Sequence, residues 1–334
     1  MSYQHPSIRW LSDGQKITGY YILDRIEFPI NISGWPLLHG VLRDAGDSME
    51  MICRKPSEDI TDAWNGAIVA VSGTVRAHGE KLVLIAKSVS LAGVGPGDEV
   101  LEKVVPHAPI NETGYALELN DYIESISDPY LYDICDAAFS THSDWFLKAP
   151  ATKDGHHAYV AGLLMHTVDM ARMAEQIAAA NPEGVNRDLL MAGTLLHDIG
   201  KAYAFRLSPA TGLVSEITDQ GRLLGHALLG ANEIRTCAKK GAPEDQISMV
   251  LQHMILACHN AGVTPTVLEA EILRQIHEIN CESELYTAAL SRTRPESFSE
   301  EVPALGKRVY NHGIVQWPSV EDCEQFERDE DEEE

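Results

Sequence analysis

The sequence predicts a multidomain protein of mixed α and β class, in which a small five-stranded β-barrel precedes an all-helical region. Short runs rich in Val, Ile, Leu and Tyr, bounded by Gly, Asp, Asn and Pro, fill the first 95 residues. From there on, apolar residues recur at helical intervals. A Gly/Pro-rich stretch, GVGPGDEV (93–100), lies between the two patterns and predicts a joint.

Five runs predict the strands of the barrel. Between the third and fourth runs, SEDITDAWNG (57–66) predicts one short helix with Ser57 as N-cap. The segment VRAHGEKL (75–82) predicts the hairpin turn between the last two strands. Five strands with a helix between the third and fourth are typical of an OB-type barrel. The strand runs are residues 17–28, 36–44, 48–54, 67–75 and 81–91.

The rest of the chain reads as helices. Residues 119–139 predict a helical pair that is broken near Pro129. Residues 206–221 predict a hairpin or an ordered loop, and in the second long helix Asn186 is the expected N-cap and Gly200 the expected C-cap. The five long amphipathic helices are expected at residues 156–180, 186–201, 221–241, 243–259 and 264–280.

The domain organisation predicted from these patterns has four parts. A barrel at 1–95 is followed by a linker and helical segment at 96–150, a helical domain at 151–312 and an acidic, disordered tail at 313–334. The tail dominates the net charge of −24: residues 321–334 contribute −9, which leaves −15 for the other 320 residues. This balance argues against coating nucleic acid through bulk charge, but it leaves room for a local basic groove or a metal-dependent nuclease.

The cysteine pattern predicts a reducing, cytoplasmic setting. The six cysteines form no C-x-x-C pair, and the chain is not short and disulfide-dense. The N-terminus MSYQHPSIRW lacks the apolar core of a signal peptide, and no apolar run approaches the length of a membrane span.

A barrel of this type suggests binding of single-stranded nucleic acid through stacking aromatics and a basic groove. The candidate platforms are aromatic, although any one of them could instead belong to the core. The domain is nearly neutral, with nine basic and ten acidic residues in the first 95. Candidate platforms are Tyr20, Tyr21, Phe28 and Trp35, and candidate phosphate contacts are Arg43, Arg54, Lys55, Arg76 and Lys87.

Histidines lie on five successive predicted helices, each within a largely apolar stretch. Burying that many imidazoles without partners would cost a few kcal/mol each, so a shared metal site is the economical explanation. Neutral imidazole and carboxylate suit Mn, Fe, Co or Zn. The histidines are His166, His197, His226, His253, His259 and His277, and Asp198 adds a carboxylate beside His197.

The stretch LLHDIGK (195–201) concentrates this chemistry. His197 and Asp198 end an apolar helix, from which they reach one site from two sides, and Asp198 could bridge two ions. Lys201 lies just beyond Gly200, where it would act as a clamp for a metal-bound phosphate. Arg222 is a candidate for the same task or, alternatively, a structural ion-pair partner.

The motifs GLLMHT (162–167), LLHDIGK (195–201) and GRLLGH (221–226) resemble the HD-domain superfamily of metal-dependent phosphohydrolases. The segments PATKDGHHAYVAGLLMHT, DQGRLLGH, HMILACHN and PTVLEAEIL resemble the YhaM-type 3′→5′ exoribonucleases over roughly residues 14–312. That resemblance implies an OB domain before an HD domain, a divalent metal, and single-stranded RNA, with DNA also possible, as substrate.

Two positions depart from the pattern of that family. The family usually has His-His-Gly where this chain has Cys258, His259 and Asn260, and an Asp where this chain has His277. Both replacements can bind metal, but each changes charge or softness. The resemblance therefore implies His166, His197, Asp198, His226 and His259 as metal ligands, with Cys258 and His277 as conditional ones.

The resulting hypothesis is phosphodiester hydrolysis at one or two divalent ions. Mn is the first choice, with Co, Fe, Mg and Zn as alternatives. Asp198, Lys201 and Arg222 are the catalytic candidates, while His156 and His157 could either contact the terminal nucleotide or serve in capping and packing. The alternatives are a nucleic-acid-binding protein with an impaired HD domain and an HD nucleotide phosphohydrolase. Single-stranded RNA or DNA is the expected partner, no membrane is expected, and the helices of 96–150 could pack within the chain or in a homo-oligomer.

Overall fold

The computed structural model describes residues 5–30, 34–79, 81–93, 98–239, 241 and 243–314. The chain forms two compact units, Met1–Asn280 and Cys281–Glu334. The predicted acidic tail (313–334) lies outside the described residues from position 315 onward. Among the residues described, no helix is long and apolar enough to cross a bilayer.

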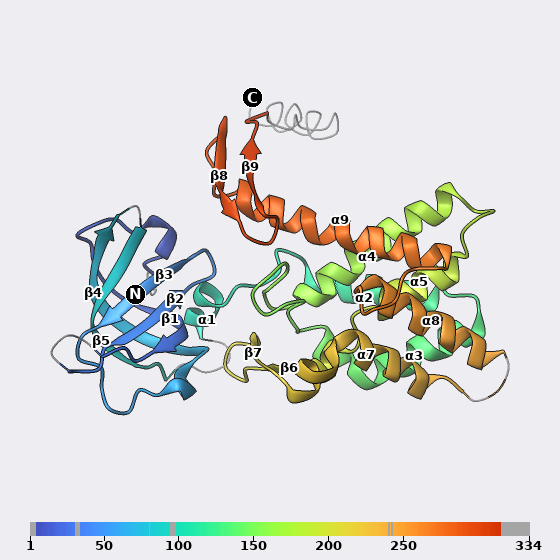
Figure 1. Cartoon of the computed structure of the whole chain (residues 1–334), viewed down its shortest axis with the longest axis horizontal. Coiled ribbons are helices and arrows are strands. Elements are labelled where there is room, and N and C mark those ends of the chain that lie inside the picture. Colours follow the sequence, from blue (N-terminus) through green and yellow to red (C-terminus); the bar gives the residue numbers. More distant parts are fainter. Residues whose placement is uncertain are drawn as a thin grey trace, which may run out of the picture. The chain divides into compact units, whose positions relative to one another are not determined.

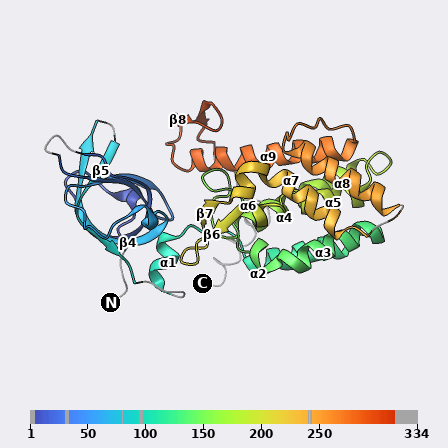
Figure 2. The ribbon, with the colours of Figure 1, turned by 60° about the horizontal axis from the view of Figure 1, so that its bottom comes forward.

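The first unit begins with a closed five-stranded barrel, which confirms the predicted fold of this part (Figure 1). The strands are paired in the order β1-β2-β3-β5-β4, and β4 pairs with β1 to close the ring, seen end-on in Figure 2. Only the β3–β5 pairing is parallel. The strands are β1 (Lys16–Glu27), β2 (Leu38–Arg43), β3 (Ser48–Cys53), β4 (Ala67–His78) and β5 (Lys81–Leu91).

Alternating burial explains why these runs form a barrel. Along β2 and β3 every second residue is buried, as expected for strands with one face on a core. Leu38 and Leu42 of β2 and Met51 of β3 are fully buried in the barrel interior. Closure pairs every strand on both sides, which removes the exposed edges of an open sheet.

The prediction of a short helix at 57–66 is wrong in the extent of the helix and in its N-cap residue. The segment contains a single 3₁₀ turn, η2 (Asp62–Trp64), with Thr61 rather than Ser57 at the N-cap position. The Ser57 carbonyl instead accepts the Ile60 amide in a tight turn. Trp64 is buried against the barrel core, so side-chain burial rather than the capping pattern sets this turn.

The remainder of the first unit is helical, as predicted. The pair α2 and α3 packs on α4 and α5, so its apolar faces are used within the chain. The segment predicted as a hairpin or ordered loop is an antiparallel hairpin of β6 (Phe205–Leu207) and β7 (Val214–Ile217). The helices are α1 (Glu99–Val104), α2 (Glu112–Glu124), α3 (Pro129–Phe146), α4 (Gly162–Ala180), α5 (Arg187–Leu196), α6 (Lys201–Ala204), α7 (Asp219–Cys237), α8 (Glu244–Cys258) and α9 (Leu268–Leu290).

Several helices differ from the sequence pattern in their boundaries or their regularity. The helix predicted from residue 156 begins only at Gly162, because Ala161 before it has a left-handed backbone. Gly225 has a non-helical backbone and kinks α7. The last helix, α9, continues to Leu290. The second unit adds a hairpin that the sequence analysis did not predict, β8 (Ser297–Val302) and β9 (Lys307–Asn311).

Candidate metal centre

Three buried side chains form the middle of the candidate site. His166 lies on α4, whereas His197 and Asp198 lie in the turn between α5 and α6, and all three are 0% exposed. His197 and Asp198 were predicted to end a helix at 186–201 and to reach one site from two sides. In the structure α5 ends at Leu196, and the turn lets neighbouring side chains converge.

Gly200 keeps this turn close to α7. It was predicted as the C-cap of the helix, but the C-cap of α5 is His197 and Gly200 lies just before α6 with a φ of −67°, so that prediction is wrong. The requirement is one of space, because a Cβ at this position would lie 2.1 Å from the His226 carbonyl oxygen and 2.3 Å from the Gly230 nitrogen. Glycine therefore allows the backbone of α7 to pack directly against the turn that carries Asp198.

Hydrogen bonds fix the orientation of His166. Its Nδ1 lies 2.7 Å from Oδ1 of Asn280 on α9, and an amide oxygen can only accept. The proton of the neutral ring is therefore on Nδ1, and the lone pair is on Nε2. His157 Nε2 also donates to Asn280 Oδ1, at 3.0 Å, so Asn280 holds two imidazoles at once.

His197 is oriented in the same way by the backbone. Its Nδ1 donates to the Thr194 carbonyl at 2.7 Å, which leaves the lone pair on Nε2. The Nε2 atoms of His197 and His166 lie only 3.1 Å apart, and His197 Nε2 is 3.2 Å from Asp198 Oδ2. Two lone pairs beside a carboxylate oxygen repel one another unless a cation is present between them.

Lys201 supplies one positive charge at this point. Its ammonium is 3% exposed overall and donates to Asp198 Oδ2. Burial alone would raise the pKa of Asp198, but the Lys201 charge outweighs it, so this pKa lies well below its usual range. The carboxylate is therefore ionised, as a metal ligand must be.

Two further histidines lie near the other carboxylate oxygen of Asp198 and form the second half of the site. The Nε2 atoms of His226 and His259 each lie 3.5 Å from Asp198 Oδ1, and the two rings are 4.4 Å apart. Asp198 Oδ1 and His226 Nε2 are buried and have no hydrogen-bond partner among the described atoms. Buried polar atoms without partners are costly, and a divalent cation would satisfy both. The residues therefore fit a metal on either side of Asp198.

The imidazoles of His166, His226, His259 and His277 remain neutral near pH 7. Burial, more than any other cause, lowers the pKa of His226 to about 4, of His259 to about 3 and of His277 to about 2. The pKa of His166 is also well below its ordinary value because of burial. Neutral imidazole is the form that binds metals.

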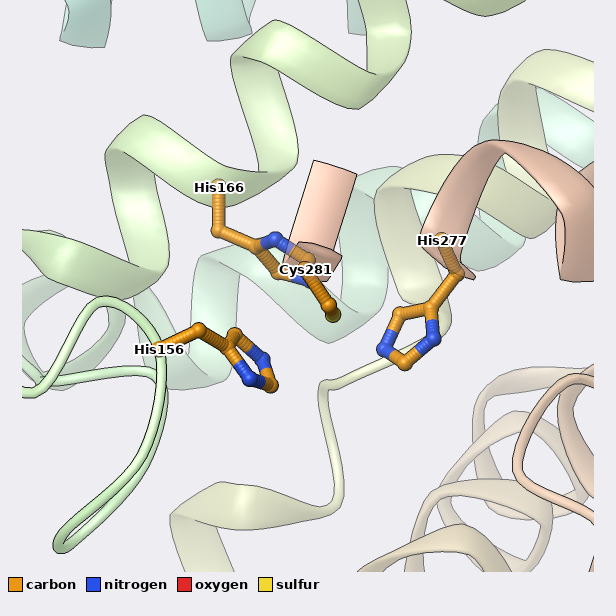
Figure 3. Close-up of side chains that lie close together, drawn as sticks. All are labelled: His156, His166, His277 and Cys281. Carbon is orange, nitrogen blue, oxygen red and sulfur yellow. The ribbon is translucent and has the colours of Figure 1, made fainter. Parts of the chain in front are cut away.

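His277 and His156 complete the ring of histidines. Figure 3 shows His156, on the loop before α4, and His277, on α9, pointing toward His166; Cys281, also drawn, follows His277 by one turn of α9. The His277 ring lies 5.4 Å from that of His166 and 5.5 Å from that of His197. His156 was expected near the terminal nucleotide, and its position against the centre keeps that prediction open. The predicted ligand Cys258 is buried at the end of α8, next to His259.

His157 lies where a contact to nucleic acid is excluded. It is 3% exposed, its Nδ1 lies 2.7 Å from the Tyr159 hydroxyl, and its Nε2 is bonded to Asn280. The prediction that it contacts the terminal nucleotide is therefore wrong, because both ring nitrogens have protein partners. Its packing role, the alternative considered from the sequence, agrees with this burial.

Lys201 lies at the centre, and Arg222 lies near its edge. Arg222 is exposed on the first turn of α7, four residues before His226, and its Nε donates to the Ile217 carbonyl. The roles of Lys201 and Arg222 toward phosphate remain predictions.

Of the predicted barrel contacts, Trp35 and Arg54 are accessible. Trp35 is 70% exposed, and Arg54 is also exposed. Leu38, three residues after Trp35, pairs with Cys53, which directly precedes Arg54. Trp35 and Arg54 therefore lie at the same end of the barrel. Tyr21 is 0% exposed and its hydroxyl donates to the Pro6 carbonyl, so it cannot stack on a base and that prediction is wrong. Tyr20 is half-buried against the apolar side chains of α1.

Sequence reasoning missed Asn280 and the Thr194 carbonyl, which orient two of the histidines. Asn280 lies three residues after His277, which is one helical turn, and Thr194 lies three residues before His197. A polar residue one turn from a candidate ligand is the signal that could have indicated them.

The sequence is similar to one protein family and to known proteins. Residues 163–290 match the HD domain family. The 3′-5′ exoribonuclease YhaM of Shouchella clausii is 32% identical over 304 residues, covering 89% of this chain and 93% of that protein. The YhaM of Halalkalibacterium halodurans is 30% identical over 305 residues, with the same coverage. The second OB-fold domain of replication protein A from Methanococcus maripaludis covers 28% of this chain and 98% of its own, at 16% identity and a TM-score of 0.24.

A closed OB-type barrel followed by helices that carry histidines around an HD pair defines a metal-dependent HD phosphohydrolase with an N-terminal barrel. Within that class the identity and coverage of the relatives are decisive. The chain belongs to the YhaM family of 3′-5′ exoribonucleases.

Proposed function

We propose that this protein is a divalent-metal-dependent exonuclease that removes nucleotides from the 3′ end of single-stranded RNA. The observation that carries the proposal is the pair of Nε2 atoms of His166 and His197, 3.1 Å apart beside the Asp198 carboxylate. This arrangement supports a cation, and the relatives named 3′-5′ exoribonuclease support the reaction and its direction.

The proposed ligands divide between the two oxygens of Asp198. His166 and His197 face Oδ2, and His226 and His259 face Oδ1. Mn²⁺ is the proposed ion, because imidazole with carboxylate suits it, and Co²⁺, Fe²⁺, Mg²⁺ and Zn²⁺ are alternatives. A bound divalent ion supplies an activated water nucleophile and offsets the charge that grows on the phosphoryl oxygens.

The side chains of the protein provide binding and orientation. Lys201 neutralises Asp198 in the absence of metal and is in position to hold a phosphate oxygen once a cation takes over that carboxylate. Arg222, exposed at the start of α7, is proposed to contact the next phosphate. Burial lowers the pKa of His156 to about 4, so this neutral ring would contact the terminal nucleotide without carrying charge.

The barrel is proposed to hold the strand. Trp35 offers a stacking surface and Arg54 a phosphate contact at one end of the barrel. A mononucleotide substrate would need no such module, which favours a polynucleotide. We propose the domain division 1–95, 96–150, 151–312 and 313–334 and a cytoplasmic setting, which the lack of a C-x-x-C pair in a chain that is not short and disulfide-dense supports.

A 5′-labelled single-stranded RNA oligomer incubated with the full chain and Mn²⁺ tests the proposal. We expect a ladder that shortens from the 3′ end and disappears with a chelator. A matched DNA oligomer and a duplex RNA measure the preference for single-stranded RNA. Retarded but uncut RNA would instead indicate a binding protein, and hydrolysis of mononucleotides alone would indicate a nucleotide phosphohydrolase.

A further inference from the structure

The motif GRLLGH (221–226) contains two leucines that the metal centre does not use. Leu223 is 83% exposed and Leu224 is 51% exposed, both near the beginning of α7. A single exposed leucine is common on a protein surface, whereas adjacent ones form apolar surface of the kind that contacts another molecule. Packing of the helical core does not account for these two side chains.

Glycines on both sides of the leucines hold this part of the backbone. Gly221 packs against α6, since a Cβ there would lie 2.6 Å from the Ala204 carbonyl oxygen. Gly225 has a φ of 74° and a ψ of 151°, a conformation that is essentially restricted to glycine, and a Cβ there would meet no atom within 4 Å. Gly225 is therefore required for the bend itself, which separates the leucines from the rest of α7 directly before His226.

The leucines lie beside the accessible side of the Asp198 centre. Among the four histidines around Asp198, His226 has a side chain that is 30% exposed, whereas the other three are 8% exposed or less. Leu223 and Leu224 precede His226 by three and two residues. Three residues of backbone span at most about 11 Å. A nucleotide whose phosphate lies at the centre would therefore have its base within reach of the two leucines.

We propose that Leu223 and Leu224 form an apolar wedge that contacts the last bases of a single-stranded polynucleotide and separates them from one another. The proposal rests on the proposed function, because that function brings the 3′ end to this centre. Leucine is among the side chains that insert between neighbouring bases and unstack them. Such a contact does not depend on base identity, since every base has a flat face. Arg222, exposed directly before the pair, adds a cation for the adjoining phosphate.

An RNA oligomer with 2-aminopurine as its 3′-terminal base tests this contact. Its last linkage is a phosphorothioate that resists hydrolysis, and the full chain is added with Mn²⁺ until the anisotropy of a 5′ label shows complete binding. We expect the 2-aminopurine fluorescence to rise with the wild type, because unstacking relieves quenching of this base. It should stay low with the double variant Leu223→Ser/Leu224→Ser. No rise with the wild type, or an equal rise with both proteins, would overturn the proposal.

Steady-state hydrolysis of unmodified RNA separates base contact from chemistry. In the double variant, KM should rise by about 10-fold while kcat changes little, because the leucines would touch the bases and not the reacting phosphate. Leu117→Ser is the matched control, since Leu117 is 64% exposed and lies on α2, and it should leave KM unchanged. A fall in kcat with KM unchanged, or the same rise in the control, would contradict the assignment.

The other possible occupant of this surface is a second copy of the chain. A wild-type oligomer that dissociates in the double variant, measured by light scattering, would overturn the proposal, whereas an unchanged oligomeric state supports it. The fluorescence rise requires no hydrolysis. A chain that shows the rise without cleaving RNA therefore removes only the proposed function, and a chain that cleaves RNA without the rise removes only this inference.

Discussion

The barrel and the helical part of the first unit differ in what they bury. The barrel core is apolar, and Asp44 is the only buried charged side chain among the described residues up to 93. The helical part buries His166, His197, Asp198 and Lys201 at 3% exposure or less. The barrel is thus built for stability alone in its interior, whereas the helical core accepts electrostatic cost in order to assemble a reactive centre.

The largest expected difference between the two regions is catalytic. Asp198→Ala removes the carboxylate that both halves of the centre share, and hydrolysis of labelled RNA should fall by roughly 10³-fold or more, because the cations lose their common ligand. RNA binding measured by gel retardation should remain, since it is assigned to the barrel. Asp198→Asn, which keeps the shape, serves as the check on folding, and unchanged hydrolysis in a folded variant would refute the site.

A decrease in pH should lower the stability of the helical core. In the folded chain the pKa values of His156 and His226 are about 4, below the ordinary value of 6.5. The unfolded state therefore binds more protons than the folded state between about pH 6.5 and 4, and stability falls as pH decreases through that window. The slope is about 1.4 kcal/mol per pH unit for each such histidine. Urea titrations of metal-free protein at pH 7 and pH 5, followed by circular dichroism, measure it, and equal midpoints would contradict the burial argument.

Metal affinity should depend on a residue that does not bind the metal. Asn280→Leu removes the acceptor that holds the protons of His166 and His157 in place, and metal affinity should weaken by about 10- to 100-fold. Asn280→Asp keeps an acceptor and should retain most of the affinity. Calorimetric titration with Mn²⁺ compares the three proteins, and equal affinities in all of them would show that Asn280 only fills space.

The smallest expected effect lies in the barrel. Trp35→Ala should weaken binding of single-stranded RNA by about 1 kcal/mol, or ~5-fold, because the base that stacks on this side chain loses that contact. Phe298→Ala is the matched control, since Phe298 is also an exposed aromatic residue but lies on β8. Fluorescence anisotropy with a labelled oligomer measures both, and an equal loss in the control would remove the proposed barrel interface.

The sequence predicted the parts of the fold that depend on periodicity. The five barrel strands and the long helices were predicted from alternating or helical apolar patterns. The histidines of the site were predicted from their positions within those helices. The short helix at 57–66 was wrong because burial of Trp64 outweighs the capping signal of Ser57. The prediction that Tyr21 is a stacking platform was wrong, because the alternation of residues along a strand does not reveal which face points into a closed barrel.

Contacts between residues that are far apart in the sequence could not be predicted from local patterns. The bonds from Asn280 to His157 and His166 join residues more than 100 positions apart. The close approach of Gly200 to His226 likewise depends on how α7 packs, whereas a local pattern indicated only an ordinary helix cap. Local propensity predicts helices and strands well, whereas the residues that hydrogen-bond to the metal ligands are brought into place by tertiary packing.

The glycine at position 200 has one more consequence. Since no side chain fits between it and the backbone of α7, the spacing between the turn that carries Asp198 and the backbone of His226 is set by main chain resting on main chain. A larger residue at position 200 would therefore push His226 away from the carboxylate without touching either side chain.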